Sequence, residues 1–246
     1  MSSGKTTKIS RHQLKKYKNC NFIIDLLYFI FSEKSQNKLI IMSSPKLIIF
    51  DYNDTLVTPF EVPNLPEKAN AIKNSKTGLI DKISCGENPE TDDLKLLPEV
   101  IECFQFIKNQ KLLWEECQFG IASTSYTRHT EKCTRASLAI FEIDEKMTLL
   151  QFLNRNRYEN GKETSQQLQI GRRPPLSCDK SVHIKNIINC SDFNIKEEDI
   201  LFFDDDTGHV ENVGNKMPNV KIVHCPEGLT MERLKYGLSK FGTNFC

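Results

Sequence analysis

Short apolar runs that end in acidic or hydroxyl side chains are the most informative feature of this sequence. The run LIIF leads to Asp51, GIA leads to Ser123, and ILFF leads to Asp204 and Asp205. Lys180 opens another segment, in which apolar residues recur at helical spacing. Carboxylates that share one crevice repel each other unless a cation lies between them. Oxygen ligands of this kind favour Mg²⁺, which keeps some of its water and leaves room for a phosphate.

These residue types can together perform phosphoryl transfer. A carboxylate such as Asp51 can attack phosphorus and carry a covalent phosphoryl group. A divalent cation lowers the repulsion between that nucleophile and an anionic substrate. The hydroxyl of Ser123 and the ammonium of Lys180 can then bind the remaining phosphoryl oxygens. Each group alone also has an ordinary use, since serine and aspartate cap helices and most lysines are solvated.

The elements that must position these groups alternate between strand and helix. Alternation at this spacing predicts an α/β fold, a Rossmann-like doubly wound parallel sheet that is covered on both faces. In such sheets the binding crevice lies at the carboxyl ends of the strands, where the chemical groups above are expected. The predicted strands are 47–50, 119–122, 200–203 and 220–223, with a further one at 139–143, and the predicted helices are 97–113, 127–138, 180–189 and 229–241.

Two polar stretches interrupt this alternation, and a basic extension precedes it. We predict a small loop or hairpin insertion over 61–96 and a loop insertion over 154–179, because both lack sustained periodicity. Residues 1–41 are predicted to be a disordered or helical extension to a domain over 42–246. The basic and then apolar order of the extension leaves a targeting segment open as an alternative. Its apolar stretch, 22–31, is too short for a membrane span, so no stable membrane insertion is expected.

Composition excludes several function classes. The chain has 246 residues, with 33 Lys and Arg against 32 Asp and Glu, and no basic stripe with interleaved aromatic residues. We therefore expect no nucleic-acid partner. The 9 cysteines include no Cys-x-x-Cys pair, which argues against a zinc site and against a disulfide framework. Reduced thiols predict a cytoplasmic location.

The ordered set of groups resembles the haloacid dehalogenase superfamily of aspartate-nucleophile phosphatases. The four motifs of that superfamily correspond to LIIFDYNDTL, GIAS, CDKSVHIKNI and ILFFDD in this chain. A finer similarity is to its small magnesium-dependent phosphatases of the phosphatase-1 type. That similarity lies in TL-x-x-PF after the first motif, in LLPEV, in Lys-x-x-His and in FFDD. A receiver-type signalling domain uses similar groups, but places its paired acids on the first strand.

The resemblance implies a Mg²⁺-dependent phosphomonoester hydrolase that works through an aspartyl-phosphate and has little or no cap domain. The substrate would be a phosphorylated small molecule or a phosphoprotein. The implied catalytic residues are Asp51, Asn53, Ser123 and Lys180, the implied phosphate-binding residues are Ser123, Thr124 and Lys180, and the implied metal ligands are Asp51, Asn53 through its carbonyl, Asp204 and Asp205.

One position departs from the superfamily pattern. Asn53 stands where these phosphatases have the aspartate that serves as general acid and base, a role typically worth 10²–10⁴-fold in rate. Asp54 could replace it only if the turn after the strand is unusual, because neighbouring side chains on extended backbone point apart. A slow phosphatase, a phosphoryl carrier or transferase, and a catalytically impaired phosphate-binding or phosphoprotein-binding protein all remain open.

Overall fold

A computed structural model describes residues 44–58, 70–84, 93–124, 128–154, 168–171, 178–191 and 194–242 of the chain. The predicted extension, 1–41, lies outside these residues. The greater part of the predicted loop insertion at 154–179 lies outside them as well.

A parallel sheet forms the centre of the described domain. Among the described residues it has five strands in the order β11-β10-β1-β6-β9, and every neighbouring pair is parallel. This arrangement confirms the predicted Rossmann-like α/β fold. The strands are β1 (Leu47–Phe50), β6 (Gln118–Ser123), β9 (Leu168–Ile170), β10 (Ile200–Asp204) and β11 (Lys221–His224).

The central strand β1 shows why its sequence is apolar throughout. Successive side chains of a strand point to opposite faces, so Ile48 and Phe50 enter one hydrophobic cluster while Leu47 and Ile49 enter another. All four side chains are fully buried. A strand covered on both faces needs apolar residues at every position, and the first polar residue is therefore placed where the strand ends.

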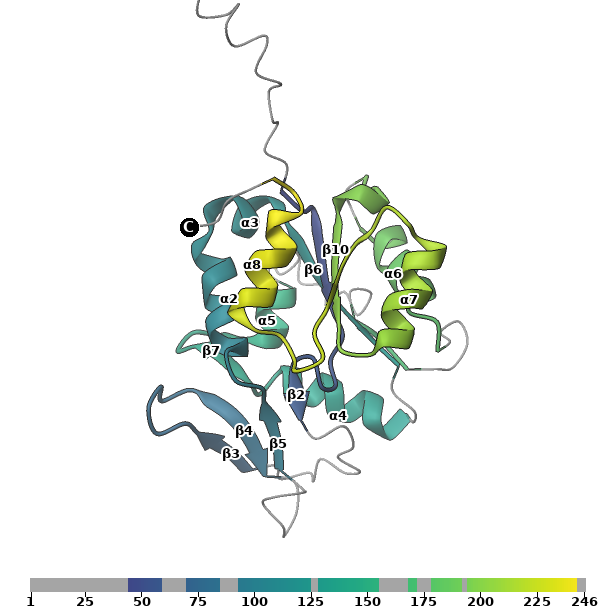
Figure 1. Cartoon of the computed structure of the whole chain (residues 1–246). Helices are drawn as coiled ribbons and strands as arrows, with labels where there is room; N and C mark the ends of the chain where they lie inside the picture. The colour runs from purple at the N-terminus through teal and green to yellow at the C-terminus, as the bar shows by residue number, and fades with distance from the viewer. Residues whose placement is uncertain are drawn as a thin grey trace, which may run out of the picture. The chain divides into compact units, whose positions relative to one another are not determined.

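Helices cover the two faces of the sheet (Figure 1). Helices α2, α5 and α8 contribute to the cluster that contains Phe50, whereas α6 and α7 contribute to the cluster that contains Ile49. No helix in the described ranges has the length and apolar character needed to cross a membrane. The helices are α2 (Val100–Asn109), α3 (Lys111–Glu116), α4 (Arg128–Leu138), α5 (Leu149–Leu153), α6 (Lys180–Asn189), α7 (Thr207–Lys216) and α8 (Met231–Ser239), with a 3₁₀ turn, η3, at Glu197–Asp199.

The helix predicted over 97–113 divides in two. Gln110 has extended backbone angles and separates α2 from α3. Pro98 lies just before α2 rather than in its first turn. Helix α7 lies outside the predicted helices and begins directly after the acids that end β10, where Asp206 caps it by accepting a hydrogen bond from the amide of His209.

The insertion at 61–96 contains more structure than the predicted loop or hairpin. The strands β3 (Asn70–Lys73) and β4 (Ile80–Ser84) do form a hairpin, but β5 (Asp93–Leu96) and β2 (Val57–Thr58) extend it to a four-stranded antiparallel sheet. Side chains from three of these strands, Val57, Ile83 and Leu94, join the domain core. Burial of this face explains why the insertion is ordered as a sheet.

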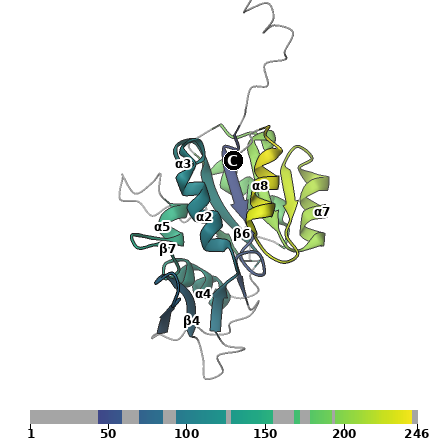
Figure 2. The same cartoon turned by 60° about the vertical axis from the view of Figure 1, so that its left-hand side comes forward.

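This small sheet and α4 lie at the end of the central sheet where β1 ends, as the views in Figures 1 and 2 agree. A two-stranded ribbon of β7 (Glu142–Asp144) and β8 (Met147–Thr148) lies between α4 and α5 in the chain. Strand β7 corresponds to the strand predicted at 139–143, but it begins three residues later.

The prediction of loops over 154–179 is wrong at β9. This strand pairs with β6 from Ile121 to Ser123 and forms an edge of the central sheet. It has only three residues, of which Leu168 and Ile170 are buried. Polar residues surround it in the sequence, so its burial depends on the neighbouring strand and not on a local hydrophobic pattern.

Candidate active site

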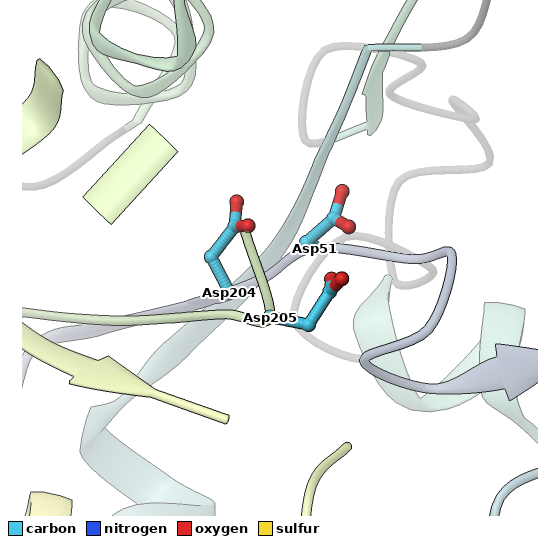
Figure 3. Close-up of side chains that lie close together, drawn as sticks. All are labelled: Asp51, Asp204 and Asp205. Carbon is cyan, nitrogen blue, oxygen red and sulfur yellow. The ribbon is translucent and has the colours of Figure 1, made fainter. Parts of the chain in front are cut away.

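Three aspartates meet where the central strands β1 and β10 end. Asp51 follows β1, Asp204 is the last residue of β10, and Asp205 comes next. One carboxylate oxygen from each lies within 4.8 Å of the others, and the close-up in Figure 3 shows the three side chains gathered at neighbouring strand ends. The parallel register of β1 with β10 produces this meeting, because Phe50 pairs with Phe203.

Lys180 connects two of these aspartates. Its side chain is fully buried, forms an ion pair with Oδ1 of Asp51, and lies 3.1 Å from Oδ2 of Asp204. The ammonium also donates a 2.6 Å hydrogen bond to the carbonyl of Ala122 on β6. The contact with Asp204 is ionic only, because Oδ2 of Asp204 is buried and has no hydrogen-bond partner among the described residues.

The start of α6 is fixed by its own cap. Asp179 accepts hydrogen bonds from the amide of Ser181 at 3.0 Å and from its hydroxyl at 2.7 Å. The second carboxylate oxygen of Asp179 pairs with Lys216 of α7. Because Lys180 is the first residue of α6, this cap determines where its side chain enters the core.

Burial and charge set the protonation of these groups. Burial raises the pKa of Asp51 to about 7, although the ammonium of Lys180 opposes that rise. Burial lowers the pKa of Lys180, but the charges of Asp51 and Asp204 outweigh it and raise the pKa. Burial also acts on Asp204, yet the charge of Lys180 and a hydrogen bond from His209 hold its pKa below the ordinary value.

The donor set fits a divalent metal ion. Burial and then the charge of Asp204 raise the pKa of Asp205, although a hydrogen bond from Thr55 opposes the rise. The three carboxylates thus face one ammonium, and the negative charge that remains would be neutralised by a cation. Oxygen-only donors of this kind suit Mg²⁺ better than a soft metal. The predicted ligands Asp51, Asp204 and Asp205 could therefore hold a metal.

Ser123 lies at the end of β6, next to β1 in the sheet. Its side chain is fully buried, and its Oγ has no hydrogen-bond partner among the described residues. An unpartnered buried hydroxyl is costly, so this hydrogen-bond donor at the end of β6 is available to a further acceptor. Thr124 follows directly and is half-buried. The phosphate-binding roles of Ser123 and Thr124 stay predictions.

The loop after β1 brings a threonine to the acidic pair. Oγ1 of Thr55 donates a 2.9 Å hydrogen bond to Oδ1 of Asp205 and accepts one from the amide of Asp205 at 3.1 Å. Thr55 is fully buried. Thr55 lies within the first motif, but its residue type alone does not indicate this role. Its two contacts tie the loop after β1 to the end of β10.

The turn after β1 is unusual, which was the condition for Asp54 to reach the site. Asp54 has a φ of 52° in the left-handed region, so the alternation of extended backbone does not apply to it. Burial and the negative charge of Asp205 raise its pKa. Asn53 itself is buried beside Asp54, and its predicted catalytic and ligand roles stay predictions.

Two histidines that the sequence reasoning missed contact the acidic pair. Nδ1 of His209 lies 3.3 Å from Oδ1 of Asp204, and Nε2 of His224 lies 2.8 Å from the carbonyl of Asp205. His209 is in the first turn of α7, and His224 is the last residue of β11. The position of His209 shortly after the paired acids in the sequence could have indicated its contact with them. The second contact depends on strand pairing between Asp204 and His224.

Comparison with protein families matches most of the chain to a family model. The model of a family described as acid phosphatase matches residues 43–244, which include every residue of the site described above. No curated protein matches the chain.

Proposed function

The chain belongs to the acid phosphatase family, and we propose that it is a Mg²⁺-dependent phosphomonoester hydrolase that forms an aspartyl-phosphate on Asp51. Family membership indicates a phosphatase with a phosphorylated substrate. It also agrees with the broad resemblance to the haloacid dehalogenase superfamily. The motifs FFDD and Lys-x-x-His support the finer assignment to the magnesium-dependent phosphatase-1 branch.

The observation that carries this proposal is the buried contact of Lys180 with two of three clustered aspartates. An ion pair with a purely structural role needs only one carboxylate for each ammonium. Additional buried negative charge destabilises the folded protein. The surplus is instead suited to hold a cation beside an anionic substrate. The unpartnered hydroxyl of Ser123 supports the same conclusion, because a phosphoryl oxygen would satisfy it.

The proposed reaction uses the two oxygens of Asp51 differently. Lys180 holds Oδ1, so Oδ2 attacks phosphorus and the bond from phosphorus to the leaving oxygen breaks. The leaving oxygen takes a proton from solvent, because the amide of Asn53 has none to give. Water then attacks the phosphoryl group, which releases phosphate and restores the carboxylate. Mg²⁺, held by Asp51, Asp204 and Asp205, would supply charge neutralisation.

Ser123 and Lys180 act on the phosphoryl oxygens in this scheme. The hydroxyl donates a hydrogen bond, and the ammonium supplies a positive charge that persists throughout the reaction. Turnover is slow because Asn53 provides neither the acid nor the base, and esters with good leaving groups are therefore the best substrates.

Asn53 also favours a second candidate function. A protein with the same fold and site but without turnover would bind phosphate or a phosphoprotein. The two functions differ in whether phosphate is released, since both keep the carboxylates, the hydroxyl and the lysine.

Hydrolysis of an aryl phosphate, with and without Mg²⁺, tests the proposal. We expect the purified protein to release phosphate only when Mg²⁺ is present, and an Asp51→Asn variant to release none. Equal release by the two proteins would refute the enzyme assignment. If neither protein releases phosphate, binding of inorganic phosphate with Mg²⁺, measured by calorimetry, would support the binding function.

A further inference from the structure

The two carboxylate oxygens of Asp204 have different surroundings, since Oδ1 has two nitrogen neighbours at hydrogen-bond distance and Oδ2 has no hydrogen-bond partner among the described residues. Its Oδ2 lies 3.1 Å from Nζ of Lys180, and its Oδ1 accepts a 3.0 Å hydrogen bond from the amide of Asp206. Nδ1 of His209 is a further donor to Oδ1, at 3.3 Å. The carboxylate of Asp204 is completely buried, so its orientation is set by these three contacts.

We infer that His209 is a positioning residue for the reaction, which holds Asp204 in the rotamer that presents Oδ2 to Lys180. This inference rests on the proposed function. The contact needs a proton on Nδ1, which the neutral imidazole can carry, because the carboxylate only accepts. His209 thus acts on the nucleophile Asp51 indirectly, through Asp204 and Lys180.

The backbone around His209 keeps the imidazole in place. The amide of His209 donates a 2.9 Å hydrogen bond to Oδ1 of Asp206, the N-cap of α7. Asp206 in turn donates its own amide to Asp204. The cap therefore places His209 about one helical turn after Asp204, whose carboxylate the imidazole contacts. The side chain of His209 is 24% exposed, at the edge of the site.

Removal of the imidazole would leave Oδ1 with the single amide of Asp206. A terminal carboxylate torsion is broad and roughly two-fold, so the carboxylate could then turn and alter both its contact with Lys180 and its approach to a metal. Loss of groups that orient metal ligands typically costs 10–100-fold in metal affinity or activity. A purely structural histidine would instead affect unfolding and leave both quantities unchanged.

Two substitutions separate these roles. His209→Asn keeps an N–H donor near the position of Nδ1, whereas His209→Phe keeps a ring of similar shape without a donor. Mg²⁺ affinity is measured by calorimetry, and kcat and KM are measured with an aryl phosphate. We expect His209→Phe to lose about 10–100-fold in Mg²⁺ affinity or in kcat, with KM less affected, and His209→Asn to retain most of both.

The calorimetric arm keeps this inference separate from the proposed function. If the wild-type protein binds Mg²⁺ without turnover, the enzyme assignment fails, while weaker Mg²⁺ binding by His209→Phe still supports positioning. Wild-type affinity and kcat in His209→Phe would overturn the inference, as would equal losses in the two variants or the absence of Mg²⁺ binding by the wild type. If His209→Phe does not unfold cooperatively, His209→Ala takes its place under the same criteria.

Discussion

Nζ of Lys180, the first residue of α6, lies 3.1 Å from Oδ2 of Asp204, the last residue of β10. The two residues come from opposite sides of β1 in the sheet order, since α6 packs on β6 and β9. Their contact therefore crosses above the end of β1, where Asp51 lies. The lysine thereby links the acidic cluster to the layer of helices.

Replacement of this lysine should destabilise the protein strongly. Lys180→Met leaves Asp51 and Asp204 buried without their ammonium, and loss of one partner from a buried ion pair typically costs about 3–5 kcal/mol. Chemical denaturation measures the change in the free energy of unfolding. The matched control is Lys196→Met, whose lysine lies 3.5 Å from Glu198 at the surface and should contribute less than about 1 kcal/mol. Similar losses in the two variants would contradict the assigned role of the ion pair.

A single substitution should restore the missing acid and base. Asn53→Asp places a carboxyl group at the position that serves this function in the resembled superfamily. We expect kcat for aryl phosphate hydrolysis to rise by up to about 10²–10⁴-fold. The double variant Asp51→Asn/Asn53→Asp serves as the control and should remain inactive. An unchanged kcat would show either that Asp54 already supplies the acid and base or that another part of the site limits turnover, and substitution of Asp54 separates these two explanations.

The cap of α6 should give a specific dependence of stability on pH. Burial raises the pKa of Asp179, but hydrogen bonds from Lys216 and Ser181 outweigh it and hold the pKa below its ordinary value of 3.8. A lowered pKa in the folded state contributes stability above the ordinary pKa, and this contribution is lost as pH falls through the lowered value. Asp179→Asn preserves the cap but cannot titrate.

The two proteins are compared by denaturation over an acid pH series. Wild type should exceed Asp179→Asn in free energy of unfolding above pH 3.8, and the difference should shrink as the pH falls below that value. A difference that does not change with pH would show that the carboxylate charge of Asp179 does not stabilise the fold.

Gly228 lets its own backbone approach the loop that follows β1 closely. It has a φ of 86°, and a Cβ there would meet the side chain of Leu97 and lie 3.3 Å from the carbonyl of Asp54. Gly78, with a φ of 71°, has nothing within 4 Å of the same position. We expect Gly78→Ala to cost about 1–2 kcal/mol from backbone strain alone, and Gly228→Ala to cost more. Thermal unfolding of both variants measures the two losses of stability. Equal losses would show that the loop after β1 adjusts to the added Cβ of Gly228→Ala without a loss of stability.

The elements that the sequence predicted best are those with a local signal. Strand β1 consists only of apolar residues and stops at Asp51, and helix α6 has both bounds as predicted, because its apolar residues recur with helical spacing after a capping aspartate. Both signals act over a few neighbouring residues. Strand β9 carries no such signal, since three residues within a polar stretch become a strand only when β6 supplies their hydrogen-bond partners.

The same division applies to the site. The sequence by itself determined which strands end in a carboxylate or a hydroxyl and where a lysine opens a helix. Only the tertiary structure decided which of these groups share a contact. Lys180 is 129 residues from Asp51 in the chain, and Thr55 is 150 residues from Asp205. His224 reaches Asp205 through the pairing of β10 with β11. Such contacts depend on strand order and register, which long-range burial sets and no local pattern records.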